Sequence, residues 1–166
     1  WTGKHRSSVA RHRRVAFQQY ISCAACHNDG GQDGRIWDFT QFGEGLRNTI
    51  TLRGRSGTGH GPLHWTGNFD EVQDFEGQIR NFALGQGLMS DTDFHAGTRS
   101  LPLGDAKAGL SADLDALAAY VTSLSAHGKS PQRNADGTLT PAAVAGQTLF
   151  QSLNCIQCHQ GSQFTD

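Results

Sequence analysis

The chain has 166 residues, enough for one domain of ordinary size or for one domain plus a fragment of another. Only 36% of them are hydrophobic, and 21 are glycine. A chain this poor in apolar side chains is expected to complete its core with something else, such as a large apolar cofactor. The formal net charge of −1 excludes a general affinity for nucleic acid, and no apolar run is long enough to span a membrane.

Residues 1–14 form a basic arm without an acidic residue; its basic residues are Lys4, Arg6, Arg11, Arg13 and Arg14. The rest of the chain is acidic on balance. We interpret the arm as a solvated tail that can also touch a partner or an anionic surface. The chain opens Trp-Thr-Gly-Lys, without an initiator Met or an apolar leader, so we interpret it as a mature or excised product.

A short helix is predicted over residues 15–22, and it leads directly into Cys23-Ala-Ala-Cys26-His27. This is the pattern of c-type haem attachment. Two thiols on one turn reach the two vinyl groups at one edge of a porphyrin, and the next residue presents its imidazole to the iron. The motif therefore predicts a covalent haem on Cys23 and Cys26, with His27 as the proximal ligand.

The stretch 43–68 is rich in Gly and has little helical period, which predicts an extended loop that wraps the haem. Trp37 and Trp65 are expected to pack on the haem edge, or else in an ordinary loop core. His60 and His64 flank a Gly-Pro turn in this loop. They are candidate iron ligands or partners of the haem propionates, and the alternative is that they are ordinary surface histidines.

A second helix is predicted over residues 70–84, with apolar residues at helical spacing: Val72, Phe75, Ile79 and Phe82. Met89, the single Met of the chain, follows in a Gly-rich stretch. Class I c-type cytochromes supply an axial thioether from this place in the chain. The sequence therefore predicts Met89 as a ligand of the first iron, with a core-filling role as the alternative.

The clearest helix is predicted over residues 111–126. Ser111 is a good N-cap, and acidic residues follow in the first turn, where the helix dipole favours them. One apolar stripe follows: Leu114, Leu117, Ala118, Val121 and Leu124. This helix resembles the C-terminal helix that closes the haem pocket in class I c-type cytochromes.

Residues 128–140 form a polar linker, after which Thr140-Pro141 starts another helix. That helix runs into a second motif, Cys155-Ile-Gln-Cys158-His159. The chain has four Cys and the two motifs use them all. A zinc site, a thioredoxin-like pair and disulfides are the alternatives, but none of them needs a His directly after each pair. The sequence predicts a second haem c on Cys155 and Cys158, with His159 as its proximal ligand.

We therefore predict an all-α fold: a class I cytochrome c-like helical haem domain with long loops, plus the start of a second such domain. The predicted domains are the basic arm 1–14, a first cytochrome c domain 15–127, the linker 128–140 and the start of a second cytochrome c domain 141–166. The second haem would need cover from a C-terminal continuation, from another chain or from the first domain.

The stretch Leu46-Arg47-Asn48-Thr49-Ile50-Thr51-Leu52 and the later His64-Trp65-Thr66-Gly67 resemble bacterial diheme cytochrome c peroxidases and the related methylamine-utilisation diheme enzymes. The segment from Gly146 through His159 to Asp166 is similar to the start of their second haem domain. This resemblance implies two haems and the reduction of hydrogen peroxide. It also implies a catalytic Glu directly before a Met, but Leu88 stands there in Gly87-Leu88-Met89.

Leu88 cannot assist O–O cleavage, because that step needs an acid–base group beside an open iron position. We therefore expect an electron-transfer diheme c-type cytochrome module, as part of a larger oxidoreductase, that exchanges electrons with redox partner proteins. The alternative is a diheme cytochrome c peroxidase-like enzyme. Because haem c is attached outside the bacterial cytoplasm, we expect a periplasmic or extracellular protein.

Overall fold

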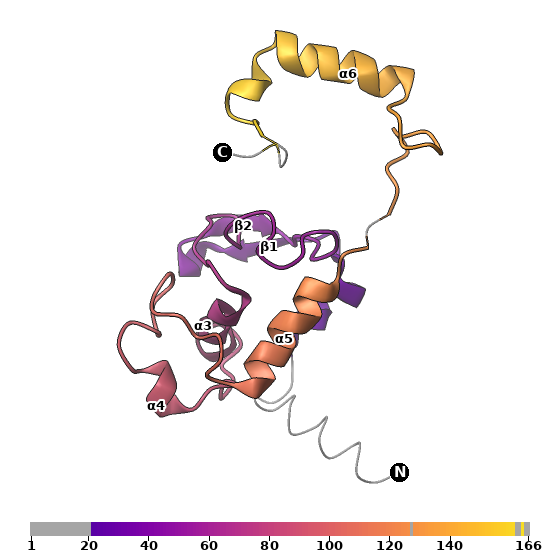
Figure 1. Ribbon diagram of the computed structural model, residues 1–166. Coiled ribbons are helices and arrows are strands. Elements are labelled where there is room, and N and C mark those ends of the chain that lie inside the picture. The colour runs from indigo at the N-terminus through magenta and orange to yellow at the C-terminus, as the bar shows by residue number, and fades with distance from the viewer. Residues whose placement is uncertain (1–20, 127, 162–163, 165–166) are drawn as a thin grey trace, which may run out of the picture. The chain divides into compact units, whose positions relative to one another are not determined.

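The computed structural model describes residues 21–126, 128–161 and 164 (Figure 1). It divides the chain into two compact units, Trp1–Ala126 and His127–Asp166. The basic arm predicted at 1–14 and most of the helix predicted at 15–22 lie outside the described residues. Among the described residues, no helix is long and apolar enough to cross a membrane.

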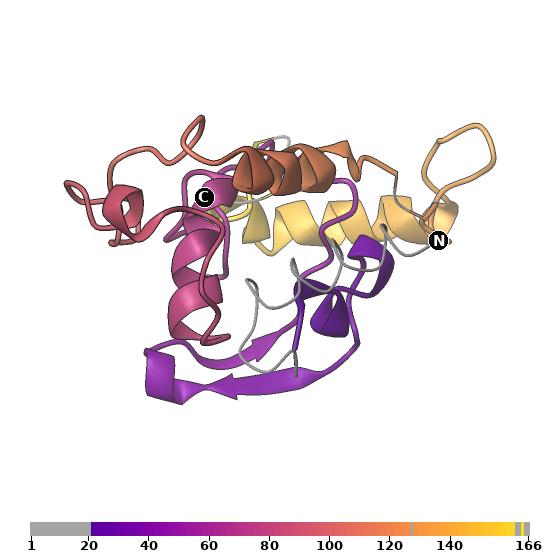
Figure 2. The same ribbon diagram turned by 90° about the horizontal axis from the view of Figure 1, so that it is seen from below.

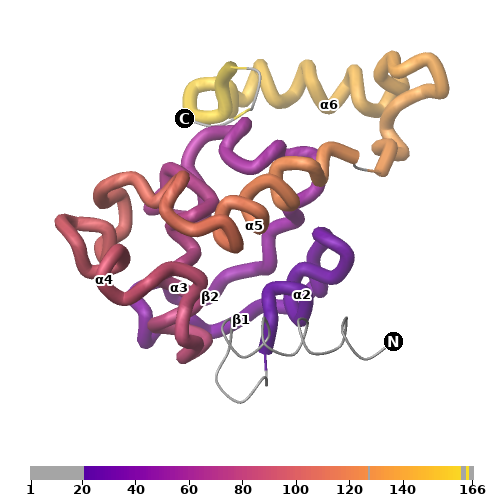
Figure 3. The backbone as a smooth tube through the Cα atoms, turned by 60° about the horizontal axis from the view of Figure 1, so that its bottom comes forward, coloured from indigo at the N-terminus to yellow at the C-terminus, as the bar shows by residue number. Residues whose placement is uncertain are grey.

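The first unit contains, in chain order, α2 (Cys23–Cys26), the 3-10 turn η2 (Asn28–Gly30), β1 (Ile36–Phe39), η3 (Thr40–Phe42), β2 (Gly45–Asn48), η4 (Val72–Asp74), α3 (Phe75–Asn81), α4 (Asp91–Phe94) and α5 (Ala112–Ser123). The tube in Figure 3 passes from α2 through the two strands to α3, α4 and α5. The helices α2 and α4 lie at opposite ends of this unit (Figures 1 and 3).

Strands β1 and β2 form an antiparallel hairpin in which Trp37 lies opposite Arg47. The chain reverses through η3 and then Gly43, whose φ of +80° is the left-handed conformation that favours glycine. Trp37 and Arg47 are half-buried, whereas Ile36 and Leu46 are 68% and 66% exposed. The hairpin therefore turns one face toward the unit and the other toward solvent.

The prediction of an all-α, class I cytochrome c-like fold is wrong, because the described residues contain this sheet and only short helices. Two of the helices, α2 and α4, have four residues each. The alternation Ile-Trp-Asp-Phe at 36–39 is typical of a strand, and its partner lies in the stretch 43–68 that was expected to be a loop. The helix predicted at 70–84 is shorter too, since it begins as η4 and α3 ends at Asn81.

Two apolar clusters pack against one face of α5. The Met89 cluster consists of Ile79, Leu88, Met89 and Leu114. The Phe69 cluster consists of Leu63, Phe69, Val72 and Ala118, with Phe75 packed against it. Leu114 and Ala118 lie four residues apart, so a single stripe of α5 reaches both clusters. The predicted stripe and its Ser111 N-cap are confirmed: the Ser111 Oγ accepts a hydrogen bond from the Leu114 N–H at 3.3 Å.

The hairpin is joined to the end of α3 by aromatic contacts. The ring centroid of Phe82, the C-cap of α3, lies 5.4 Å from those of Phe39 and Phe42. Figure 2 shows this end of α3 meeting the hairpin. The loop before α5 is held to η4 by Lys107, which is 2% exposed and whose Nζ donates to the Asp74 carboxylate.

The second unit contains α6 (Pro141–Ser152) and the 3-10 turn η5 (Cys155–Gln157). The predicted helix start is confirmed, because the Thr140 hydroxyl caps the Ala143 N–H at 3.3 Å and Pro141 occupies the first helical position. No residue of α6 is buried. Large apolar side chains such as Leu149 and Leu153 are 59% and 71% exposed.

Candidate functional site

The first Cys-x-x-Cys-His motif folds as a single helical turn. Cys23 and Cys26 open and close α2, and the His27 N–H donates to the Cys23 carbonyl at 2.8 Å. Both thiols are unpaired. The His27 Nδ1 lies 3.4 Å from the Gly31 carbonyl oxygen, at the end of the turn that follows the motif. Two free thiols and an imidazole therefore project from one turn.

The second motif repeats this arrangement in the second unit. The His159 N–H donates to the Cys155 carbonyl at 3.0 Å, and the His159 Nδ1 lies 3.0 Å from the Phe164 carbonyl oxygen. Cys155 and Cys158 are also unpaired. Each motif has one exposed and one half-buried Cys, and the motifs differ at the histidine, because His27 is half-buried and His159 is exposed.

The oxygen beside each Nδ1 decides what the imidazole can do. A carbonyl oxygen accepts but cannot donate, so the contact is a hydrogen bond only when Nδ1 carries the proton. Nε2 then keeps its lone pair and is free to bind a metal. A backbone carbonyl therefore favours the same tautomer in His27 and His159, with the proton on Nδ1, although the two carbonyls belong to loops of different sequence.

The turn after His27 is held by distant parts of the first unit. The Gly30 carbonyl accepts a hydrogen bond from the Leu52 N–H at 2.9 Å, and the Arg53 Nε donates to the Asp29 carbonyl at 2.9 Å. Gly30 has a φ of +74°, and a Cβ there would lie 2.6 Å from a methyl group of Leu124 at the end of α5. The motif is therefore anchored both by the chain after the hairpin and by α5.

One charged group affects a thiol of the first motif, and another charged group, in β2, has an unsatisfied nitrogen. Burial raises the pKa of the Cys26 thiol, and the negative charge of Asp33 adds to this effect. The Arg47 Nε is buried and has no hydrogen-bond partner among the described residues. A propionate is the kind of group that would satisfy it.

The two predicted tryptophans point their N–H groups to different partners. The Trp37 Nε1 donates to the Asp33 carboxylate at 3.0 Å, and the Trp65 Nε1 donates to the Asn48 carbonyl at 2.8 Å. Trp37 is half-buried, while Trp65 is 57% exposed. The structure therefore fixes both indoles on or beside the hairpin, and their packing on a haem edge stays a prediction.

His64 and His60 differ sharply. His60 is exposed, whereas the half-buried His64 ring lies 4.2 Å from the Phe69 ring and 4.9 Å from the Phe75 ring. Burial lowers the pKa of His64, against the opposing effect of its hydrogen bond to Asn68. The negative charge of Glu44 also raises the pKa of His64, and a smaller effect of His27 lowers it.

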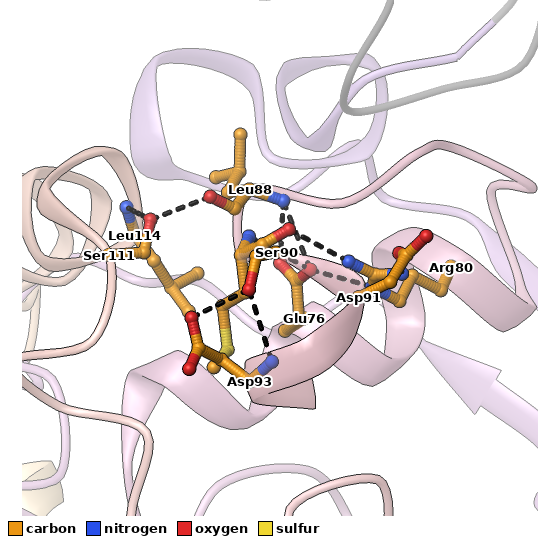
Figure 4. A network of polar contacts seen from close by, with 9 residues as sticks. Glu76, Arg80, Leu88, Ser90, Asp91, Asp93, Ser111 and Leu114 are labelled. Carbon is orange, nitrogen blue, oxygen red and sulfur yellow. Dashed lines mark hydrogen bonds and ion pairs between the residues drawn. The ribbon is translucent and has the colours of Figure 1, made fainter. Parts of the chain in front are cut away.

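Met89 is 3% exposed and lies in its apolar cluster, with its backbone held by a buried ion pair. The fully buried Glu76 carboxylate accepts hydrogen bonds from the Leu88 N–H at 2.8 Å and the Met89 N–H at 3.2 Å. The Arg80 guanidinium pairs with Glu76 at 2.7 Å (Figure 4). It also donates to the Met89 carbonyl at 2.9 Å. Iron ligation by Met89 stays a prediction.

Sequence reasoning missed Glu76, although one signal was present. Glu76 lies between Val72 and Ile79 on the apolar side of the predicted helix, where an acid is out of place unless it is paired. It restores a carboxylate next to Leu88, but this one is fully engaged by Arg80 and two backbone N–H groups. It is an anchor for the Met89 segment rather than a free acid.

No group of three or more His, Cys, Asp or Glu that could hold a metal ion lies within the described residues.

The chain is similar to one curated protein. No family model matches the chain, and no solved structure matches it. The chain is 33% identical over 154 residues to a protein named hydrazine synthase subunit gamma from Kuenenia stuttgartiensis. The match covers 88% of this chain and 39% of that relative, so the chain spans well under half of the relative's length.

Proposed function

We propose that the chain is an electron-transfer module with two covalently bound haem c groups. The observation that carries this proposal is the repeated geometry of the two motifs. In each motif the His N–H bonds back to the first Cys, both thiols are unpaired, and Nδ1 faces a carbonyl oxygen. A bare metal site would need converging ligands, whereas a haem needs only two thiols and an axial nitrogen from each turn.

Each residue has a defined role in this proposal. Cys23 and Cys26 would form the two thioether bonds to the first haem, and His27 would ligate its iron through Nε2. In the second unit, the equivalent cysteines and His159 would hold the second haem. Held in this way, a haem would supply one-electron chemistry between its ferric and ferrous states. The protein sets the reduction potential through axial ligands, hydrogen bonds and burial.

The relative supports a place within a larger redox assembly. Its name describes one subunit of an enzyme that makes hydrazine. We therefore propose that this chain is likewise a part of a multi-component oxidoreductase and exchanges electrons with partner proteins. Attachment of haem c takes place outside the bacterial cytoplasm, so the proposal places the chain in the periplasm or outside the cell.

The resemblance to diheme peroxidases remains a proposal about ancestry rather than activity. Position 88 is Leu, and the neighbouring carboxylate of Glu76 is fully engaged by Arg80 and by backbone N–H groups. Neither side chain can deliver a proton to bound peroxide. The module should therefore turn over hydrogen peroxide poorly.

Intact mass and absorbance test the proposal. The chain is produced in a host that attaches haem c, and its mass is measured under denaturing conditions. The mass should exceed that of the polypeptide by two haems, and pyridine haemochrome absorbance should give two haems per chain. A bare polypeptide mass, or zinc in place of haem after such maturation, would contradict the proposal.

A further inference from the structure

The His64 imidazole shares one arrangement with the two motif histidines. Its Nδ1 lies 2.9 Å from the Asn68 Oδ1, just as the Nδ1 atoms of His27 and His159 each face a carbonyl oxygen. With the Asn68 amide oxygen as acceptor, the proton belongs on Nδ1 and the lone pair on Nε2. Histidines that bind metals are commonly oriented this way by a second oxygen partner.

The orientation of His64 is built in from several sides. Asn68 is held in turn by Glu44, because its Nδ2 lies 3.5 Å from the Glu44 Oε1. The ring of Phe69 packs over the imidazole with an interplanar angle of 35°, and Phe75 meets it edge-on at 85°. The His64 backbone has a φ of +66°, a left-handed conformation that a non-glycine residue rarely adopts. Residues held in this region are found preferentially at functional sites, and His64 combines it with a ring fixed on three sides.

The strand β2 and the residues after it connect His64 to the first motif. On one side, the Trp65 Nε1 bonds to the Asn48 carbonyl at the end of β2. On the other side, the Leu52 N–H bonds to the Gly30 carbonyl directly after the motif. The residue next to His64 and the turn next to His27 are therefore both tied to the stretch 48–52. The competing ligand, Met89, lies among aliphatic side chains in its cluster.

On the basis of the proposed function, we infer that His64 would bind the first haem iron through Nε2 as the second protein ligand beside His27, with Asn68 as the positioning residue. Two nitrogen ligands leave no open position for peroxide, so this iron carries electrons only. An axial Met raises the reduction potential of a haem, so ligation by His64 predicts a lower potential than ligation by Met89 would give.

Electron paramagnetic resonance of the ferric, haem-loaded chain tests this inference. His64→Ala should lose one low-spin signal of the wild-type protein and gain a high-spin one, and added imidazole should restore the low-spin signal. His60→Ala is the matched control, four residues away in the same loop and exposed, and it should leave the spectrum unchanged. Met89→Leu should keep the low-spin signal as well. Asn68→Ala should shift or broaden the low-spin signal of the first haem.

The outcomes separate two kinds of failure. A wild-type chain without haem would refute the proposed function itself. A chain that holds both haems but whose spectrum is unchanged by His64→Ala would overturn the inference alone. Loss of the low-spin signal, and of a far-red sulfur-to-iron band, in Met89→Leu would assign the position to Met89 instead. An unchanged signal in Asn68→Ala would remove the positioning role.

Discussion

The two Cys-x-x-Cys-His motifs of this chain share the same hydrogen bonds at their histidines but lie in different surroundings. The turn after His27 is tied to the chain beyond the hairpin and to α5, and the unit around it has two apolar clusters. The turn after His159 follows a helix with no buried residue. Under the proposed function, the five-residue motif would supply attachment and the proximal ligand in both units, while only the first unit surrounds its motif with packed structure. The predictions below test this contrast.

The largest effect is expected from removing one attachment site at a time. Cys23→Ser with Cys26→Ser and Cys155→Ser with Cys158→Ser should each lose one haem in an intact mass measurement. Only the first pair should also lower the thermal unfolding temperature of the first unit, followed by near-ultraviolet circular dichroism, because only there does packed structure surround the motif. If both pairs of Cys→Ser substitutions lowered this unfolding temperature equally, the two motifs would not differ in their structural surroundings as described.

Removal of the buried Glu76 carboxylate, which holds the backbone of the Met89 segment, should cause the next largest loss of stability. Glu76→Ala leaves Arg80 without its buried carboxylate partner, so the free energy of unfolding should fall by about 3 kcal/mol. Asp91→Ala is the matched control, since Asp91 pairs with the same guanidinium but its side chain is 84% exposed. That change should cost at most about 1 kcal/mol. Urea denaturation measures both, and similar losses would argue against the anchor.

The two N-cap residues give a smaller and more local comparison. Ser111→Ala removes a cap and also the hydrogen bond from the Ser111 hydroxyl to the Leu88 carbonyl at 2.7 Å, so it should destabilise the first unit by about 1–2 kcal/mol. Thr140→Ala removes only the cap of α6. It should leave the denaturant midpoint of the first unit unchanged and reduce helical circular dichroism slightly.

The smallest expected effect is on acid stability. The pKa of Asp115 is lowered because the Gln73 side chain and the Gly109 N–H donate to its carboxylate. A lowered folded-state pKa stabilises the fold above the unfolded value, and this stability is lost as the pH falls through the folded pKa. Asp115→Asn should therefore make the stability of the first unit depend less on pH below about pH 4.

Asp136 provides the control for this titration. Its pKa is also lowered, but by the side chain and then the N–H of Thr138, two residues away in the second unit. Asp136→Asn should therefore leave acid unfolding of the first unit as it is in the wild type. A change of the same size in both variants would show that the effect is not specific to the bonds around Asp115.

The helix starts and the motifs could be predicted because their signals are local. Ser111 and Thr140 cap the helices that follow them, and each motif specifies its own turn. The hairpin was missed because the pairing of Trp37 with Arg47 joins residues ten positions apart across a stretch that is rich in Gly. The Glu76 anchor was missed for a similar reason, since its partners lie 12 and 13 residues further on. Short-range patterns do not contain such pairings.

Leu124 marks the point where the first unit can be cut from the chain. Its side chain fills the space over Gly30, and its carbonyl accepts a hydrogen bond from the Gly54 N–H at 2.7 Å. A fragment that ends before Leu124 would lose the side chain that packs on Gly30, in the turn after His27. It would also lose the hydrogen bond that the Leu124 carbonyl accepts from the Gly54 N–H. A fragment that ends at Ala126 keeps both. A fragment designed to keep the first motif and its surroundings should therefore extend past the last turn of α5.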